Sequence, residues 1–121
     1  MIGHSLPSPV FGPAQGMHGA TFTVDAAFFT DDIDEHGLVV DIGLATEALA
    51  ETLAPLRYKN LDEVPEFKGN FTTTEFLCGH IFKTLADHVR TGKLADNSRV
   101  KKLRIMLHES HVARAWYEAE V

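Results

Sequence analysis

Apolar and polar residues alternate along residues 18–28, which predicts a half-buried β-strand. One face of this strand carries His18, Ala20, Phe22, Val24, Ala26 and Phe28. The segment TDDIDEHG (30–37) predicts a turn, and the apolar run 38–42 predicts a second strand that returns as a hairpin. A short strand is expected within residues 1–6, before a loop rich in proline and glycine over 7–16.

The apolar spacing then changes to three and four residues, which predicts a helix over 43–56 that ends near Pro55. After a loop, Thr72 and Glu75 have the spacing of a capping box and predict the start of a second helix. Gly92 is expected to end this helix. Two closing strands are predicted over 99–107 and 112–118, joined by a turn around HES (108–110).

This order of elements predicts one α+β domain over residues 1–121, with a four-stranded antiparallel sheet and two helices on one face. A four-stranded sheet that does not close on itself leaves two open edges. Proteins usually cover such edges or pair them with another strand. Closure of the sheet by oligomerisation is therefore expected.

The composition and charge of the chain argue against several classes of function. The 121 residues are 45% hydrophobic and 23% charged, which suits one globular domain. The net charge of −6 and the lack of a basic stripe argue against nucleic acid as a partner. No apolar run approaches the roughly 20 residues of a membrane helix. The single cysteine, Cys78, and the lack of a secretory signal pattern lead us to expect a cytoplasmic protein.

Glu109 is the most unusual polar position. It continues the row Leu103, Ile105 and Leu107, which should face the core of its strand. A carboxylate in such a row must reach water or find hydrogen-bond donors, because its unpaired burial is costly. Glu109 is thus either a solvated glutamate at a strand end or an anchor that accepts two N–H bonds from an amidine-like edge.

The other candidates are a threonine-rich helix start and several histidines. Thr72, Thr73, Thr74 and Glu75 either cap the helix or bind a polar heterocycle or anion through hydroxyl and N–H groups. Catalytic zinc normally takes three protein ligands, and His4 with His18 supply only two. Ala20 shares the face of His18, where a further histidine would have completed a metal-binding arm. Cys78 is expected to be a small buried hydrophobe.

Five segments, in this order, resemble the 6-pyruvoyl-tetrahydropterin synthase family, including its 6-carboxytetrahydropterin synthase branch. They are GMHGATFTVDAAF, LVVDIG, RYKNLDEVPEF, NFTTTEFL and LHESHVARAWY. They are similar to the family's H-G-H-N-Y strand, the strand entering its first helix, its D-H-K-N-L-D loop, its T-T-E helix start and its C-terminal E-T strand. The resemblance implies the T-fold, in which three subunits close a β-barrel and two trimers stack, with active sites at subunit interfaces.

The resemblance implies roles for individual residues. Glu109 corresponds to the glutamate that anchors the amino-pyrimidine edge of a pterin, and Thr73, Thr74 and Glu75 to residues that contact it. The zinc histidines correspond to His4, His18 and Ala20, so one ligand is missing. The catalytic Asp-His pair corresponds to Arg57 and Tyr58. The catalytic cysteine has no counterpart in FGPAQGM, and Cys78 does not replace it.

We therefore expect a homo-oligomer, a trimer or hexamer, that binds a pterin or purine-like heterocycle through Glu109, Thr73, Thr74 and Glu75. We expect it to hold neither zinc nor another cofactor and to lack the synthase reaction, and no catalytic residue is assigned. One alternative is a carbon–oxygen lyase with altered chemistry on a pterin similar to dihydroneopterin triphosphate, using Tyr58, Arg57 or the remaining histidines. Another is a non-catalytic binding or regulatory subunit.

Overall fold

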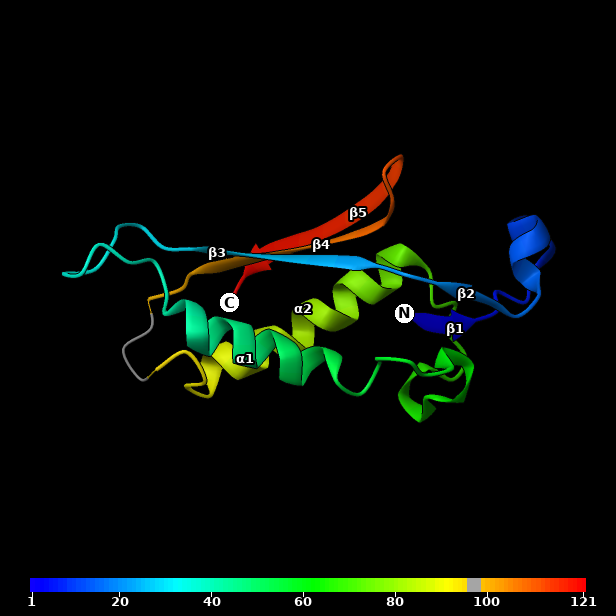
Figure 1. The fold of residues 1–121 in the computed structure, drawn as a ribbon, viewed down its shortest axis with the longest axis horizontal. Coiled ribbons are helices and arrows are strands. Elements are labelled where there is room, and N and C mark those ends of the chain that lie inside the picture. Colours follow the sequence, from blue (N-terminus) through cyan, green and yellow to red (C-terminus); the bar gives the residue numbers. More distant parts are fainter. Residues whose placement is uncertain (96–98) are drawn as a thin grey trace.

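The computed structural model describes residues 1–95 and 99–121, and its elements confirm the α+β class (Figure 1). The strands are β1 (Ile2–His4), β2 (His18–Ala20), β3 (Thr23–Phe29), β4 (Lys102–Ser110) and β5 (Ala113–Glu120). The α-helices are α1 (Ile42–Leu53) and α2 (Thr74–Arg90). Three 3₁₀ segments lie at Pro9–Gln15, Leu61–Glu63 and Pro65–Phe67. No helix in the described ranges is both long and apolar enough to span a bilayer.

The strands form two sheets, so the prediction of a single four-stranded sheet is wrong. β1 and β2 make an antiparallel ribbon, and β3, β4 and β5 make an antiparallel sheet in that order. The continuous strand expected over 18–28 is interrupted at Thr21 and Phe22, which belong to neither β2 nor β3. Both α-helices cover the same face of the three-stranded sheet (Figure 1).

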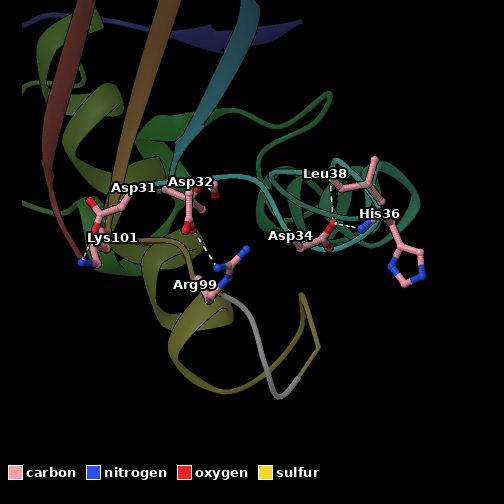
Figure 2. A network of polar contacts seen from close by, with 8 residues as sticks. Asp31, Asp32, Asp34, His36, Leu38, Arg99 and Lys101 are labelled. Carbon is pink, nitrogen blue, oxygen red and sulfur yellow. Dashed lines mark hydrogen bonds and ion pairs between the residues drawn. The ribbon is translucent and has the colours of Figure 1, made fainter.

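The strand expected over 38–42 is also absent, because side-chain hydrogen bonds hold this segment as a loop. Asp34 accepts hydrogen bonds from the backbone N–H groups of His36 and Leu38, at 2.8 and 2.9 Å (Figure 2). These bonds lower the pKa of Asp34, with Leu38 the larger cause. Asp41 then caps α1 by accepting a bond from Leu44 N at 3.0 Å. The segment therefore leads directly into a helix.

Two ion pairs connect the same loop to the segment before β4. Asp32 contacts Arg99 at 2.7 Å, and Asp31 pairs with Lys101 (Figure 2). All four side chains are well exposed, so these pairs contribute little to stability.

Helix α2 begins one residue later than the capping box predicted. The cap is Thr73, whose hydroxyl accepts a hydrogen bond from Phe76 N at 3.2 Å. Thr72 instead lies buried beside His4. The expected apolar face of the helix is confirmed, since Leu77, Ile81 and Leu85 are buried in the core.

The closing hairpin fixes the surroundings of Glu109. Leu103, Ile105 and Leu107 are fully buried, which confirms their predicted parity. The strand runs on to Ser110, so the segment HES belongs to β4 and not to the predicted turn. The register between β4 and β5 shifts between His108 and Ser110. Such a bulge re-aims side chains, and Glu109 is exposed although its parity continues the buried row.

Candidate functional site

Two of the predicted ligand-binding residues are in direct contact. Thr74 Oγ1 donates a hydrogen bond to Glu109 Oε2 at 3.2 Å. Thr74 is the first residue of α2 and Glu109 lies at the bulged end of β4, 35 residues further along the chain. The other carboxylate oxygen of Glu109 accepts no hydrogen bond within the described residues, so it is available to a ligand.

The remaining two predicted residues flank this contact without joining it. Thr73 uses its hydroxyl oxygen to cap α2, and its hydroxyl proton remains free to be donated. Glu75 is exposed in the first helical turn and makes no hydrogen bond or ion pair to any described residue. The structure therefore joins Thr74 and Glu109, and Thr73 and Glu75 are the chain neighbours of Thr74.

The ribbon of β1 and β2 brings two histidines together. His4 lies opposite His18 in the register, and their ring centroids are 4.6 Å apart. His4 Nδ1 is 3.0 Å from both the carbonyl oxygen and the hydroxyl of Thr72. His18 Nδ1 is 2.8 Å from the carbonyl oxygen of Gly16. Sequence separation alone could not reveal this pairing.

The environment of His4 favours its neutral form. Burial is the main cause that lowers its pKa, followed by the charge of His18. The hydrogen bond to Thr72 and the carboxylates of Asp62 and Glu109 act in the opposite direction. The electrostatic effect of Glu109 on His4 links the histidine pair to the cluster at the start of α2.

The donor set does not fit the zinc ion that the resemblance implies. Ala20 occupies the third ligand position, and the register pairs it with Ile2 of the core. No group of three or more His, Cys, Asp or Glu side chains suited to a metal occurs within residues 1–95 and 99–121. Catalytic zinc takes three protein ligands, and this site offers two.

The segment that corresponds to the Asp-His pair is tied to β1 through its backbone. Tyr58 N donates to Met1 O at 2.8 Å, and Gly3 N donates to Lys59 O at 2.9 Å. These bonds hold Tyr58 at a φ of 56°, a left-handed conformation that a bulky side chain rarely adopts. The Tyr58 side chain is 82% exposed.

A carboxylate–imidazole pair exists elsewhere in the molecule. Asp25 of β3 and His108 of β4 are 2.8 Å apart. Their register positions share the sheet face opposite the core-facing row of Leu107 and Val24. The alternation of β3 and β4 places both residues on this face, but the sequence alone did not identify the pair.

A cavity of about 340 Å³ lies among α1, β3 and the start of the chain. Its buried lining includes Leu77, Ile81 and Leu107, and its exposed lining includes Arg57 and Tyr58. The sequence analysis did not predict this cavity, because its walls come from segments far apart in the chain.

Cys78 is buried, as expected, with 1% of its surface exposed. Burial raises the pKa of its thiol, and Sγ donates to the carbonyl of Ala115 at 3.3 Å. A protonated and enclosed thiol is a poor nucleophile.

Comparison with solved structures establishes the fold. The chain is similar to 6-pyruvoyl tetrahydropterin synthase from Caenorhabditis elegans, with 20% identity and a TM-score of 0.80, over 98% of this chain and 88% of that one. The Plasmodium vivax enzyme gives 14% identity and a TM-score of 0.79, over 99% and 90%. The Plasmodium falciparum enzyme gives 14% and 0.73 over the same shares.

Sequence comparison gives the family. Among curated proteins, no sequence matches this chain significantly. The family profile of 6-pyruvoyl tetrahydropterin synthase, however, matches residues 1–120, which is nearly the whole chain. The protein therefore belongs to the 6-pyruvoyl tetrahydropterin synthase family.

Proposed function

We propose that this protein binds a pterin or a similar purine-like heterocycle, with Glu109 as the anchor of its amino-pyrimidine edge. The observation that carries the proposal is the contact between Thr74 and Glu109. It holds one carboxylate oxygen in place and leaves the other without a hydrogen bond from the described residues. A carboxylate can accept two parallel N–H bonds from such an edge, and the hydroxyls of Thr73 and Thr74 can bond polar ring atoms.

The binding site is proposed to be completed at an interface between copies of the chain, in a trimer or hexamer. The three-stranded sheet ends in β3 on one side and β5 on the other, and neither strand has a second partner within the described residues. Strand edges of this kind pair readily with another chain. Glu109 lies close to the exposed tip of the β4–β5 hairpin, where Val112 is 81% exposed.

The synthase reaction of the family is not proposed for this protein. The third zinc position holds Ala20, and the Asp-His positions hold Arg57 and Tyr58. The residues that remain can bind and orient a heterocycle: Glu109 accepts N–H protons, and the threonine hydroxyls donate or accept.

One observation favours a second candidate, a lyase with altered chemistry on a related pterin. Tyr58 keeps a strained backbone conformation while its side chain is exposed. Strain of this kind concentrates at functional sites. A tyrosine hydroxyl can donate a proton to a reacting group.

Calorimetric titration of the purified protein with neopterin tests the anchor. Glu109→Gln keeps the shape of the side chain but removes its charge, and we expect the affinity to fall about 100-fold. Glu47→Gln, an exposed change on α1, is the matched control and should bind like the wild type. Undiminished binding by Glu109→Gln would contradict the proposal.

A further inference from the structure

The hydrogen bonds of the histidine pair determine which nitrogen of each ring carries the proton. Nδ1 of His4 faces the carbonyl oxygen of Thr72, and Nδ1 of His18 faces the carbonyl oxygen of Gly16. A carbonyl oxygen can only accept a hydrogen bond, so both Nδ1 atoms must be donors. In the neutral ring, Nε2 then bears a lone pair and acts as an acceptor.

These Nε2 atoms have no hydrogen-bond partner within residues 1–95 and 99–121. His4 is only 4% exposed, but its Nε2 is not an enclosed atom, since no described side chain has a fully buried nitrogen or oxygen without a hydrogen-bond partner. The small exposed part of His4 therefore includes Nε2, and a ligand can reach this nitrogen. The pair thus presents two adjacent acceptors that the protein itself leaves unused.

A metal ion is not the partner that these residues fit. The third ligand position is Ala20, and the described chain brings no further His, Cys, Asp or Glu into a group with the pair. The difference has a chemical consequence for the ligand. A metal ion is coordinated by lone pairs of the ligand's oxygen atoms. A neutral imidazole nitrogen instead accepts a hydrogen bond, so the ligand must offer an O–H or N–H group.

We infer that His4 and His18 bind hydroxyl groups of the ligand directly, as a pair of hydrogen-bond acceptors in place of a metal. The ligand class is therefore a heterocycle with an uncharged polyhydroxylated substituent. A fully ionised phosphate is a poor fit, because its oxygens offer lone pairs and no protons. This inference rests on the proposed function, since Glu109 must hold the ring for the substituent to reach the histidines.

The backbone joins the two parts of this site. Thr72 contacts His4 Nδ1, and two residues later Thr74 contacts Glu109. The negative charge of Glu109 also acts on His4, where it raises the pKa of the imidazole. The histidine pair and the carboxylate anchor therefore both contact the short segment 72–74.

The test compares three pterins that differ only in the substituent at position 6: neopterin, 6-hydroxymethylpterin and 6-methylpterin. Each is titrated calorimetrically into the EDTA-treated oligomer at pH 8. We expect affinity to follow the number of hydroxyl groups, with neopterin about tenfold tighter than 6-methylpterin. His18→Phe keeps the ring contact with His4 but removes one of the two acceptors, and should reduce this ratio to about threefold because His4 remains.

Two further variants keep the test decisive. His18→Gln retains an acceptor and should keep part of the preference, and it replaces His18→Phe if that variant does not fold. Glu109→Gln should weaken all three pterins equally and leave their ratio unchanged.

The failures are distinguishable. If no pterin binds the wild type, the proposed function fails and this inference fails with it. If all three bind equally, the proposed function stands and the histidine inference is overturned. Tighter neopterin binding on addition of Zn²⁺ would also overturn it, because the metal would then be the contact.

Discussion

The start of α2 and the ribbon of β1 and β2 differ in how far their residues match the site that the family resemblance implies. At the start of α2, Thr74 and Glu109 are both present and already in contact. On the ribbon, His4 and His18 remain paired, but Ala20 occupies the position of the third ligand. Under the proposed function, recognition of the ring and contact with its substituent therefore reside on separate elements, so one can change while the other is kept.

The local structure suggests why the two regions differ in this way. Thr73 has a structural task as the cap of α2, and its loss would weaken the helix. Position 20 has no comparable polar task, because Ala20 pairs with Ile2 and packs on the core. A small apolar residue fits this environment as well as a metal-ligating side chain would.

Restoring the third metal ligand on the ribbon is expected to have the largest effect, because it would remove the difference between the ribbon and the start of α2. Ala20→His would place three histidines on the ribbon, which is the number of protein ligands that catalytic zinc requires. We expect this variant to retain about one zinc per chain after dialysis, measured by elemental analysis. Ala20→Gln is the control of similar size and should retain none. Stoichiometric zinc in the wild type would contradict our account of the ribbon.

A pair of threonine variants should separate structure from recognition at the start of α2. Thr73→Ala removes the cap and should lower the free energy of unfolding by about 1 kcal/mol. Thr74→Ala removes only an exposed contact to Glu109, so its effect on stability should stay below about 0.5 kcal/mol. Its affinity for neopterin should nevertheless fall about fivefold, because Glu109 loses its orienting bond.

Chemical denaturation and calorimetry measure the two quantities. Equal destabilisation by both threonine variants, with unchanged affinity, would show that this region is a helix start only.

The smallest effect is expected at Tyr58. Glycine tolerates a φ of 56° without steric cost, so Tyr58→Gly should raise the free energy of unfolding by about 0.5 kcal/mol. Arg57→Gly is the matched control, because Arg57 does not have a positive φ and should be destabilised. Thermal unfolding measures both. A loss of stability in Tyr58→Gly would mean that the side chain packs in the assembled protein.

Much of this arrangement could be predicted from the sequence. The buried row of β4 and the apolar face of α2 followed from simple periodicity, and that row made Glu109 stand out. The loop before α1 could not be predicted, because LVV favours a strand locally. Hydrogen bonds from the side chains of Asp34 and Asp41 decide its conformation.

The pairing of His4 with His18 could not be predicted from the sequence either. Parity showed that His18 and Ala20 share a face, but not that His4 lies opposite His18. That depends on the register of a ribbon closed by a 3₁₀ segment at Pro9–Gln15. The same holds for Asp25 and His108, which meet only when β3 and β4 align.

The separation of the ribbon from the main sheet has a consequence for binding. A two-stranded ribbon is marginally stable alone, and this one is supported by backbone bonds to Tyr58 and Lys59 and by Ser5, which donates two bonds to Asp62. Opening of the ribbon therefore requires the loss of these bonds and of the burial of Ile2 and His4. A ligand substituent bound at His4 and His18 would stabilise the ordered form of the ribbon and shift its local opening equilibrium toward that form. Affinity for the substituent would then include the free energy of ordering the ribbon.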